Sequence, residues 1–358
     1  MKSVGMIERV FNRCLLRPED LAPSQADLKV IGTFNPGAVE TADGVRLLVR
    51  VAETVREERP GYVALPRWDV GARRVVVDWL GEDEVDFEDS RVVIIKRTGL
   101  KRLAFISHLV MAHSPDGRSI DDLGPTRFLP SAEHEEFGVE DPRITPLEGR
   151  FHFTYVAVSR HGAATALAST TDFKTFERHG IIFPPENKDV VLFPERIGGH
   201  FVALHRPNPA QHFSPPEIWR ATSPDLIHWG GHAPLLGGTG QWDAGRVGAG
   251  APPLRTNAGW LEIYHGNNRR PGEIRVGRYS AGALLLDLEE PLRILATLGE
   301  ILVPETDYER QGFVPNVVFP TGAIARGETI LVYYGAADES CAVVEVRLRD
   351  LLTSLVTA

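Results

Sequence analysis

Hydrophobic residues along the chain gather in short runs separated by polar and turn-forming residues. The runs mix β-branched, aromatic and aliphatic residues and have Gly, Pro, Asn or Asp close by, as strands do. The clearest runs are 45–51, 92–96, 151–158, 201–204, 260–264 and 330–334. Helical periodicity appears only at 18–21 and 348–355. The pattern therefore predicts an all-β fold.

A loose internal repeat accompanies these runs. In each copy, one strand leads to a second that ends near a Ser or Thr, and a turn carrying Asp116, Asp172 or Asp225 follows. The last two copies continue to the aromatic anchors Phe176 and Trp229. Repetition at roughly 50 residues fits propeller blades of about four strands. We therefore predict a single five-bladed β-propeller over residues 1–358, with short N- and C-terminal extensions. A pair of β-sandwiches is the alternative, but it leaves the recurring turn unexplained.

Charge and composition narrow the expected partners. A net charge of -9 provides no electrostatic footprint for nucleic acid. Two cysteines, Cys14 and Cys341, are too few for a disulfide framework or a cysteine-based metal site. Residues 1–20 lack the apolar core of a secretory signal, and no apolar run approaches the roughly 20 residues of a membrane span. We expect a cytoplasmic protein that binds neither nucleic acid nor membrane.

The segment 51–88 is charged and irregular, and an acidic run occupies 82–89. Runs of like charge are most often solvated. A solvated loop is therefore the preferred interpretation, and a functional lip over a pocket is the alternative.

The segment most informative for chemistry is Gly-Val-Glu-Asp-Pro-Arg-Ile at 138–144. Proline disfavours the helical conformation of the preceding Asp141, which predicts an extended or turn conformation there. Neighbouring side chains of an extended segment point to opposite faces, so Glu140 and Asp141 are not expected to share one role. A turn fixed by an Asp–Arg ion pair is as compatible with these residues as catalysis is.

Further polar residues lie near the ends of predicted strands. Lys188, Arg206 and His265 together could hold a phosphate dianion, although each alone is more often a surface charge or a satisfied histidine. Sugar hydroxyls need hydrogen-bonding groups between apolar walls, and ordinary turn chemistry is the alternative use of such residues. The candidates for the hydrogen bonds are Asn35, Arg50 and Asp338, and those for the walls are Tyr264, Tyr334 and Trp242.

Several catalytic motifs are incomplete. The His-Glu-Glu at 134–136 lacks the second histidine of a zincin helix, and the glycines of 245–250 lack the Gly-Lys-Ser/Thr of a phosphate-binding loop. No Gly-x-Ser-x-Gly elbow of a serine hydrolase occurs. The sequence therefore gives no strong support for a metal or another cofactor.

Seven segments in order resemble glycoside hydrolase family 130, the mannoside phosphorylases and related β-mannosidases. They are 34–38, 138–143, 187–195, 204–207, 223–229, 313–316 and 333–338, which span most of the chain. The resemblance implies a five-bladed β-propeller, in agreement with the repeat. Members of the family are often homo-oligomers, and the sequence leaves the oligomeric state open.

The resemblance implies roles for individual residues. Asp141 is expected to be the general acid, which in several family members protonates the leaving oxygen through the mannose 3-hydroxyl. The phosphate-binding set is then Lys188, Arg206 and His265. The mannosyl subsite is then lined by Asn35, Arg50, Arg102 and Asp338.

A single displacement needs an acid for the leaving group and a nucleophile on the opposite face. Phosphate is already anionic, so a phosphorylase needs only one carboxylic acid and a cationic cradle. We therefore predict inverting phosphorolysis of β-mannosides to α-mannose 1-phosphate, with inorganic phosphate as co-substrate and no other cofactor. The substrates are β-1,2- or β-1,4-linked manno-oligosaccharides or a mannosyl-glucose, and the sequence leaves the linkage open. A β-mannosidase would need a second carboxylate to activate water, for which Glu195 and Glu262 are candidates. A sugar- or protein-binding propeller without catalysis is the remaining alternative.

Overall fold

The computed structural model describes residues 6–208, 213–270, 273 and 276–357. Strands account for 58% of the chain and helices for 6%, which confirms the mostly β prediction. All six predicted runs lie in strands, and both helical segments are helices. Within the described residues the longest helix, α2 (Leu348–Ser354), has 7 residues, and no helix could cross a membrane.

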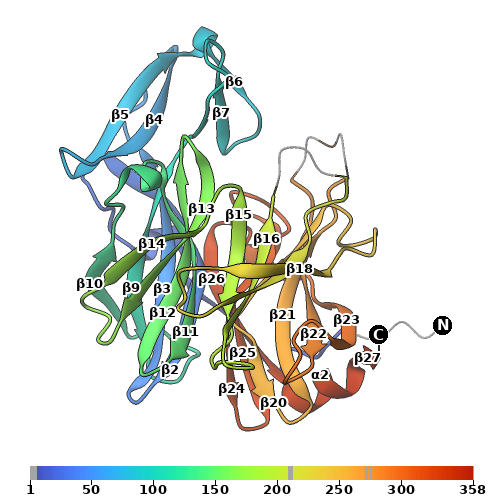
Figure 1. Ribbon diagram of the computed structural model, residues 1–358. Coiled ribbons are helices and arrows are strands. Elements are labelled where there is room, and N and C mark those ends of the chain that lie inside the picture. Colours follow the sequence, from blue (N-terminus) through green and yellow to red (C-terminus); the bar gives the residue numbers. More distant parts are fainter. Residues whose placement is uncertain (1–5, 209–212, 271–272, 274–275, 358) are drawn as a thin grey trace.

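The largest sheet of the body consists of two antiparallel groups of four strands (Figure 1). The first group pairs in the order β2-β3-β9-β10 and the second in the order β11-β12-β13-β14. A single parallel bridge between Gly138 and Ser107 joins them. The strand bounds are β2 Leu28–Thr41, β3 Gly44–Val55, β9 Ile106–Ser114, β10 Asp122–Phe128, β11 Gly138–Leu147, β12 Arg150–Ser159, β13 Gly162–Thr170 and β14 Glu177–Phe183.

Three further sheets complete the body. One pairs as β15 (Asn187–Leu192), β16 (Phe201–Pro207), β17 (Ile218–Ser223) and β18 (Gly230–Leu236). The next pairs as β19 (Arg246–Ala249), β21 (Gly259–Asn267), β22 (Tyr279–Leu286), β23 (Ile294–Leu302) and β27 (Val356–Thr357), with β20 (Leu254–Thr256) beside β21. In the last sheet, β1 (Phe11–Leu16) pairs with β26 (Ser340–Arg347), followed by β25 (Thr329–Ala336) and β24 (Val318–Arg326). The N-terminal strand is thus held by a C-terminal one.

The first strands of these groups contact one another. β2 contacts β11, β11 contacts β15, and β15 contacts β19. β24 contacts β21 on one side and β2 on the other. Apolar side chains fill the space between neighbouring groups, as where Val191 and Leu204 pack with Val247 and Leu284. The residues at the starts of the first strands are thereby brought close together.

An arm, residues 56–105, projects from the body between β3 and β9 (Figure 1). It contains a hairpin of β4 (Tyr62–Asp69) and β5 (Arg74–Gly81) and a small sheet of β6 (Val85–Phe87), β7 (Val92–Ile95) and β8 (Lys101–Leu103). The acidic run 82–89, predicted to be a solvated loop, is mostly exposed as expected, but it forms η2 (Glu82–Glu84) and β6 in place of a loop. Valines, Trp68 and Trp79 alternate with charged residues in the hairpin and pack it against Leu28 and Ile106 of the body.

The repeated turn has the same hydrogen bonds in all three copies. The carboxylates of Asp116, Asp172 and Asp225 each accept bonds from the backbone N–H groups two and three residues later. This is the turn that an Asp side chain stabilises, and it confirms the repeat. Four further short helices lie in connections: η1 Pro18–Asp20, η2 Glu82–Glu84, η3 Glu133–Glu135 and α1 Asp307–Arg310.

Candidate active site

A pocket of about 270 Å³ opens where the first strands of the body begin. Each body sheet contributes to its wall, and the arm contributes as well. Its charged and amide side chains are Asn35, Arg50, Arg91, Glu140, Asp141, Glu186, Lys188, Asp189, Arg206, Asn208, Arg246 and Asp338. Its aromatic side chains are Phe34, Phe105, Tyr279, Phe313 and Phe319.

The predicted acid, Asp141, lies in this wall and is only 7% exposed. Its Oδ1 accepts hydrogen bonds from Asn35 Nδ2 at 2.8 Å and Arg50 Nη1 at 2.9 Å. Its carbonyl oxygen accepts one from Arg143 Nη1 at 2.8 Å. The ion pair of the carboxylate is thus made with Arg50, and Arg143 instead fixes the backbone.

Glu140 faces the same pocket, so the prediction that Glu140 and Asp141 point to opposite faces is wrong. Arg50 Nη2 donates to Glu140 Oε1 at 2.8 Å while Nη1 donates to Asp141. The reason is the backbone of Asp141, which has φ 49 and is followed by a shift in the strand register. An extended strand would alternate the two side chains, but a left-handed residue with a bulge re-aims one of them.

The charge state of Asp141 depends on its partners. Burial alone would raise its pKa, but the guanidiniums of Arg50 and Arg143 and the amide of Asn35 outweigh burial. The pKa of Asp141 therefore lies below its ordinary value. In the free pocket this carboxyl is ionised near neutral pH.

The predicted cations contact two pocket carboxylates, with Lys188 near Glu140 and with Arg206 and His265 near Asp189. Lys188 Nζ is 3.9 Å from Glu140 Oε2. Arg206 is 4% exposed and places Nη1 2.6 Å from Asp189 Oδ2. Arg206 Nε is buried without a hydrogen-bond partner among the described residues. A buried, unpaired donor of a cation is a group that an anionic ligand can satisfy.

His265 lies next to Arg206, but behind it. The imidazole is fully buried and does not line the pocket. Its Nε2 is 3.3 Å from Asp189 Oδ2 and 3.3 Å from Arg206 Nη1. Burial lowers the pKa of His265, although Asp189 opposes this. His265 was predicted to bind phosphate, but in this position it can act on a ligand in the pocket only through its contact with Arg206.

Two pocket arginines were missed in the sequence. Arg246 begins β19 within the glycine-rich segment that was considered only as an incomplete phosphate loop, and its Nε is also buried and unpaired among the described residues. Arg91 comes from the arm, where the Asp89 carboxylate holds its Nη2 at 2.8 Å. The clustering of arginine with glycine was the available signal for Arg246. No sequence signal was available for Arg91.

Arg102 was expected in the mannosyl subsite, and the structure places it elsewhere. Its Nη1 is 3.0 Å from Asp78 Oδ2, and its Nη2 donates to the carbonyl of Leu65. Arg102 therefore ties β8 to the hairpin of the arm and does not line the pocket. The small sheet of the arm contains the predicted strand at 92–96, but its pairing with β6 and β8 was not predicted, and Arg91, just before β7, lines the pocket instead.

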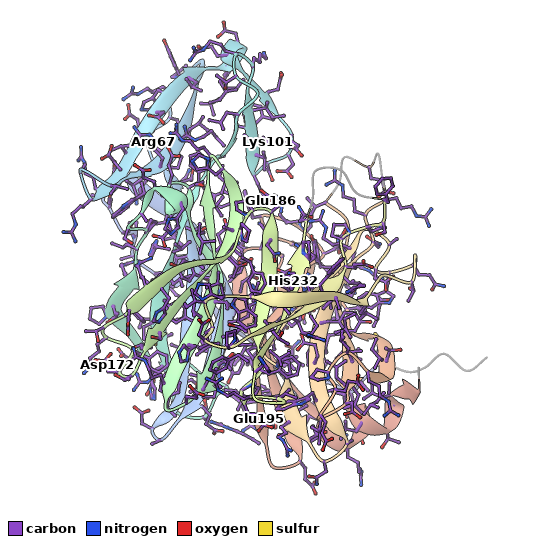
Figure 2. All side chains as sticks on the ribbon, in the orientation of Figure 1. Arg67, Lys101, Asp172, Glu186, Glu195 and His232 are labelled. Carbon is purple, nitrogen blue, oxygen red and sulfur yellow. The ribbon has the colours of Figure 1, made fainter. Side chains whose placement is uncertain are left out.

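The aromatic walls and the candidate water-activating bases were also misplaced. Tyr264, Tyr334 and Trp242 do not line the pocket; Tyr334 is fully buried and donates to Glu309. Glu195 is exposed, pairs with Arg255 and lies at the opposite end of the sheets from Glu186 (Figure 2). Glu262 is fully buried outside the pocket wall, accepts the N–H of Gly250, and has a pKa that burial raises well above its ordinary value.

Asp338 completes the side of the pocket near the arm. It follows β25 with φ 50, and its Oδ2 is 3.9 Å from Arg91 Nη1. Burial raises the pKa of Asp338 to about 6, although Arg91 and Arg50 act in the opposite direction. Asn35, Arg50, Asp141 and Asp338 therefore meet as predicted. Among the described residues, no cluster of His, Cys, Asp and Glu is arranged to hold a metal ion.

Known proteins resemble the chain over most of its length. The family model of glycoside hydrolase family 130, described as β-1,4-mannooligosaccharide phosphorylase, matches residues 84–356. A β-1,2-mannobiose phosphorylase of Listeria innocua is 40% identical over 356 residues, covering 98% of each chain. A 1,2-β-oligomannan phosphorylase of Thermoanaerobacter is 37% identical over 252 residues, covering 69% of this chain and 81% of that protein.

The solved structures agree with these sequence matches. The β-1,2-mannobiose phosphorylase from Listeria innocua, in its complex with β-1,2-mannobiose, superposes with a TM-score of 0.89 at 39% identity. The match covers 95% of this chain and 96% of that chain. The likeness therefore includes the arm as well as the body.

Proposed function

The chain belongs to glycoside hydrolase family 130, and we propose that it splits β-1,2-linked mannosides with inorganic phosphate by a single inverting displacement. It is a glycoside phosphorylase acting on β-mannosides, as its relatives are. The β-1,2 linkage is the proposed part, because the two relatives described above are named for that linkage, whereas the family model carries a β-1,4 description. The products would be α-mannose 1-phosphate and the released sugar.

One observation carries the proposal. A single pocket is lined by a carboxyl held by Asn35 and Arg50 and by Arg206 and Arg246, whose Nε atoms are buried without a hydrogen-bond partner among the described residues. A displacement needs an acid on the leaving-group side and a nucleophile on the other. Arginine forks bind a phosphate oxygen pair more strongly than they bind water. Phosphate held there needs no protein base, because it is already an anion.

Phosphate binding also bears on the proton of Asp141. The free pocket keeps this carboxyl ionised, and Lys188 is among the cations that lower its pKa. A phosphate dianion on the cationic side offsets those positive charges, so it raises the pKa of Asp141 toward a protonated state. In this proposal the Asp141 carboxyl is protonated, and can act as an acid, only when phosphate is bound. Arg50 and Asn35 hold the protonated carboxyl in place, and Asp338 and Arg91 bind sugar hydroxyls.

The two carboxylates considered as water-activating bases of a β-mannosidase lie outside the pocket. Neither Glu195 nor Glu262 lines the pocket. Of the other pocket carboxylates, Glu140 is paired with Arg50, and Asp189 is paired with Arg206 and Arg143. A carboxylate committed to a cation is a poor base for activating water. Asp338 lies near Arg91, and Glu186 accepts the backbone N–H of Ala163 and has no ion pair among the described residues. The preference for phosphorolysis therefore rests on the buried arginine donors and on the phosphorylase relatives.

A direct assay tests the proposal. The enzyme is incubated with β-1,2-mannobiose or β-1,4-mannobiose, with and without inorganic phosphate, and the products are followed by proton and phosphorus NMR. We expect α-mannose 1-phosphate from the β-1,2 substrate, only when phosphate is present. Faster turnover of the β-1,4 substrate would overturn the linkage. The β anomer of the product would overturn inversion, and free mannose in the absence of phosphate would establish hydrolysis instead.

We also propose that the body is a five-bladed β-propeller. The supporting features are the five groups of about four antiparallel strands and the contacts between their first strands. The pairing of β1 with β26 joins the first strand of the chain to the group formed by β24, β25 and β26. The pocket would then lie at the mouth of the central axis, where loops of a propeller converge. A cytoplasmic location, a homo-oligomeric state and the absence of a cofactor other than co-substrate phosphate remain proposals from the sequence.

A further inference from the structure

Asp189 is a buried carboxylate that the catalytic scheme above does not use. It lines the pocket from β15, and 2% of the residue is exposed. Its Oδ2 is 2.6 Å from Arg206 Nη1 and 3.3 Å from His265 Nε2, and its Oδ1 is 3.2 Å from Arg143 Nη2. One carboxylate thus contacts three cationic or ring nitrogens of different strands.

Asp189 also occupies a repeated backbone position. Asn35, Asp141 and Asp189 have φ values of 49, 49 and 54, and each lies at a register shift of the first strand of its group. The left-handed conformation with a bulge turns a side chain out of the normal alternation. The bulge presents Asn35 and Asp141 to each other, and it presents Asp189 to the cations.

The contacts of Asp189 connect the two halves of the site. Arg143 uses Nη2 for Asp189 and Nη1 for the backbone carbonyl of Asp141. Asp189 therefore contacts Arg206, one of the proposed phosphate-binding residues, directly, and it is linked to the backbone of Asp141 through Arg143. Gly248 of β19 packs against this arrangement so closely that a Cβ there would collide with the Asp189 carboxylate and the His265 ring.

We propose that Asp189 is a positioning residue that orients Arg206 and His265 for phosphate and, through Arg143, fixes the backbone of the acid Asp141. The inference rests on the proposed phosphorolysis, because it assigns the cations to phosphate. It goes beyond that function by making nucleophile binding and acid placement depend on one buried carboxylate.

Two physical effects of removing this charge have opposite signs. Without the Asp189 carboxylate, the cationic side of the pocket has one negative charge fewer. This change in charge alone would strengthen the attraction of the pocket for phosphate. However, Arg143 and Arg206 would then be buried without a carboxylate, beside Arg246, and such uncompensated charges are displaced or neutralised. If Asp189 is a positioning residue, the phosphate affinity lost with the orientation of Arg206 must exceed the phosphate affinity gained by removing a negative charge. The sign of the change in phosphate affinity therefore decides the matter.

The test uses the full-length enzyme with inorganic phosphate and β-1,2-mannobiose. Asp189→Asn keeps the shape and tolerates the left-handed backbone, but it lacks the charge. We expect the KM for phosphate to rise roughly 10- to 100-fold, as for loss of hydrogen bonds to charged groups, while the KM for the mannoside changes less than about 3-fold. The increase in Tm produced by phosphate should shrink in parallel.

Two further variants separate position from charge and from general damage. Gly248→Ala leaves every charge in place but displaces Asp189 and His265, so it should also raise the phosphate KM. Glu135→Gln is the matched control, because Glu135 is a buried carboxylate paired with Arg178 and Tyr155 away from the pocket. This control should lower Tm without changing the KM for phosphate.

The outcomes distinguish this inference from the function on which it rests. An unchanged or lower phosphate KM in Asp189→Asn overturns the positioning role while wild-type phosphorolysis stands. Equal increases in both KM values, as for a general loss of structure, also overturn it. If Asp189→Asn does not fold, Gly248→Ala decides alone, and an unchanged phosphate KM in that variant rejects the proposal. Wild-type enzyme that turns over mannosides without phosphate would instead overturn the proposed function.

Discussion

Arg50 Nη1 lies 2.9 Å from Asp141 Oδ1, and both side chains are more than nine-tenths buried. The pair places a permanent positive charge against the group that must donate a proton. Arg50 therefore opposes the loading of the acid in the free enzyme, and it stabilises the carboxylate that remains after proton transfer. The balance suits an acid that is protonated only while the ligands are bound.

Asp141→Asn should reduce kcat on β-1,2-mannobiose by roughly 10²- to 10⁴-fold, the usual contribution of a general acid. Asparagine can still bind Arg50 and adopt a positive φ, so Tm should change by only a few degrees. A β-mannoside with a 4-nitrophenyl leaving group provides the internal control, since that leaving group needs little protonation. It should lose far less activity than mannobiose does, and equal losses on both substrates would remove Asp141 from the acid role.

Arg246→Ala tests the arginine that the sequence did not reveal. Its Nε is buried and unpaired among the described residues, so we expect it to donate to phosphate. The KM for phosphate should rise roughly 10- to 100-fold, and the KM for the mannoside should stay within about 3-fold. Arg246→Lys keeps the charge but not the fork and should fall between these values. A rise confined to the mannoside KM would reassign Arg246 to the sugar side.

Arg91 and Arg102 form a matched pair for testing the sugar side. Both are arm arginines held by an aspartate, but only Arg91 lines the pocket. Arg91→Ala should raise the KM for the mannoside roughly 10-fold or more and leave the KM for phosphate nearly unchanged. Arg102→Ala should lower Tm while keeping kcat/KM within about 3-fold of wild type. The reverse pattern would restore Arg102 to the mannosyl subsite.

The secondary structure and the repeat were predictable because they follow from local rules. The first half of β12 alternates apolar and polar residues and its second half is a continuous apolar run, both of which indicate a strand. The Asp172 and Asp225 turns follow from side chains bonding to nearby backbone. The meeting of Asn35, Asp141 and Asp338 could be anticipated only from family motifs, because these residues lie far apart along the chain. Local pattern contains no information on such distances.

The errors arose where tertiary structure overrides the local rule. Proline after Asp141 predicts an extended or turn conformation, and the alternation of side chains was inferred from the extended one, whereas Asp141 is left-handed at a shift in strand register and Arg143 bonds to its carbonyl. Arg102 was misplaced because the arm folds into its own sheets, and their register decides which arginine reaches the pocket. The sequence position of His265 predicted a side chain that contacts phosphate. In the structure Phe319 packs against the imidazole, with 4.2 Å between the ring centroids, and helps to bury it.

Asp338 provides a prediction on stability and pH. Burial raises its folded pKa to about 6, above the roughly 3.9 of an unfolded chain. The folded state thus holds this proton more tightly, so the contribution to stability is fully present below about pH 4 and is lost as the pH rises through 6. Asp338→Asn should therefore be more stable than wild type at pH 8, by up to about 3 kcal/mol. This advantage should shrink toward pH 5, as measured by urea unfolding.

Asp116→Asn is the control of opposite sign for this experiment. Burial would raise the pKa of Asp116, but backbone N–H groups of the turn and nearby hydroxyls lower it overall. Its contribution is therefore present above the unfolded value and is lost as the pH falls. Asp116→Asn should be less stable than wild type at pH 8, and the deficit should disappear in acid. If Asp338→Asn is likewise destabilised at pH 8, then Arg91 and Arg50 outweigh burial, and the ionised carboxylate holds the arm to the pocket. Activity is expected to fall in Asp338→Asn in either case, because the substitution removes a charge that the proposed sugar site uses.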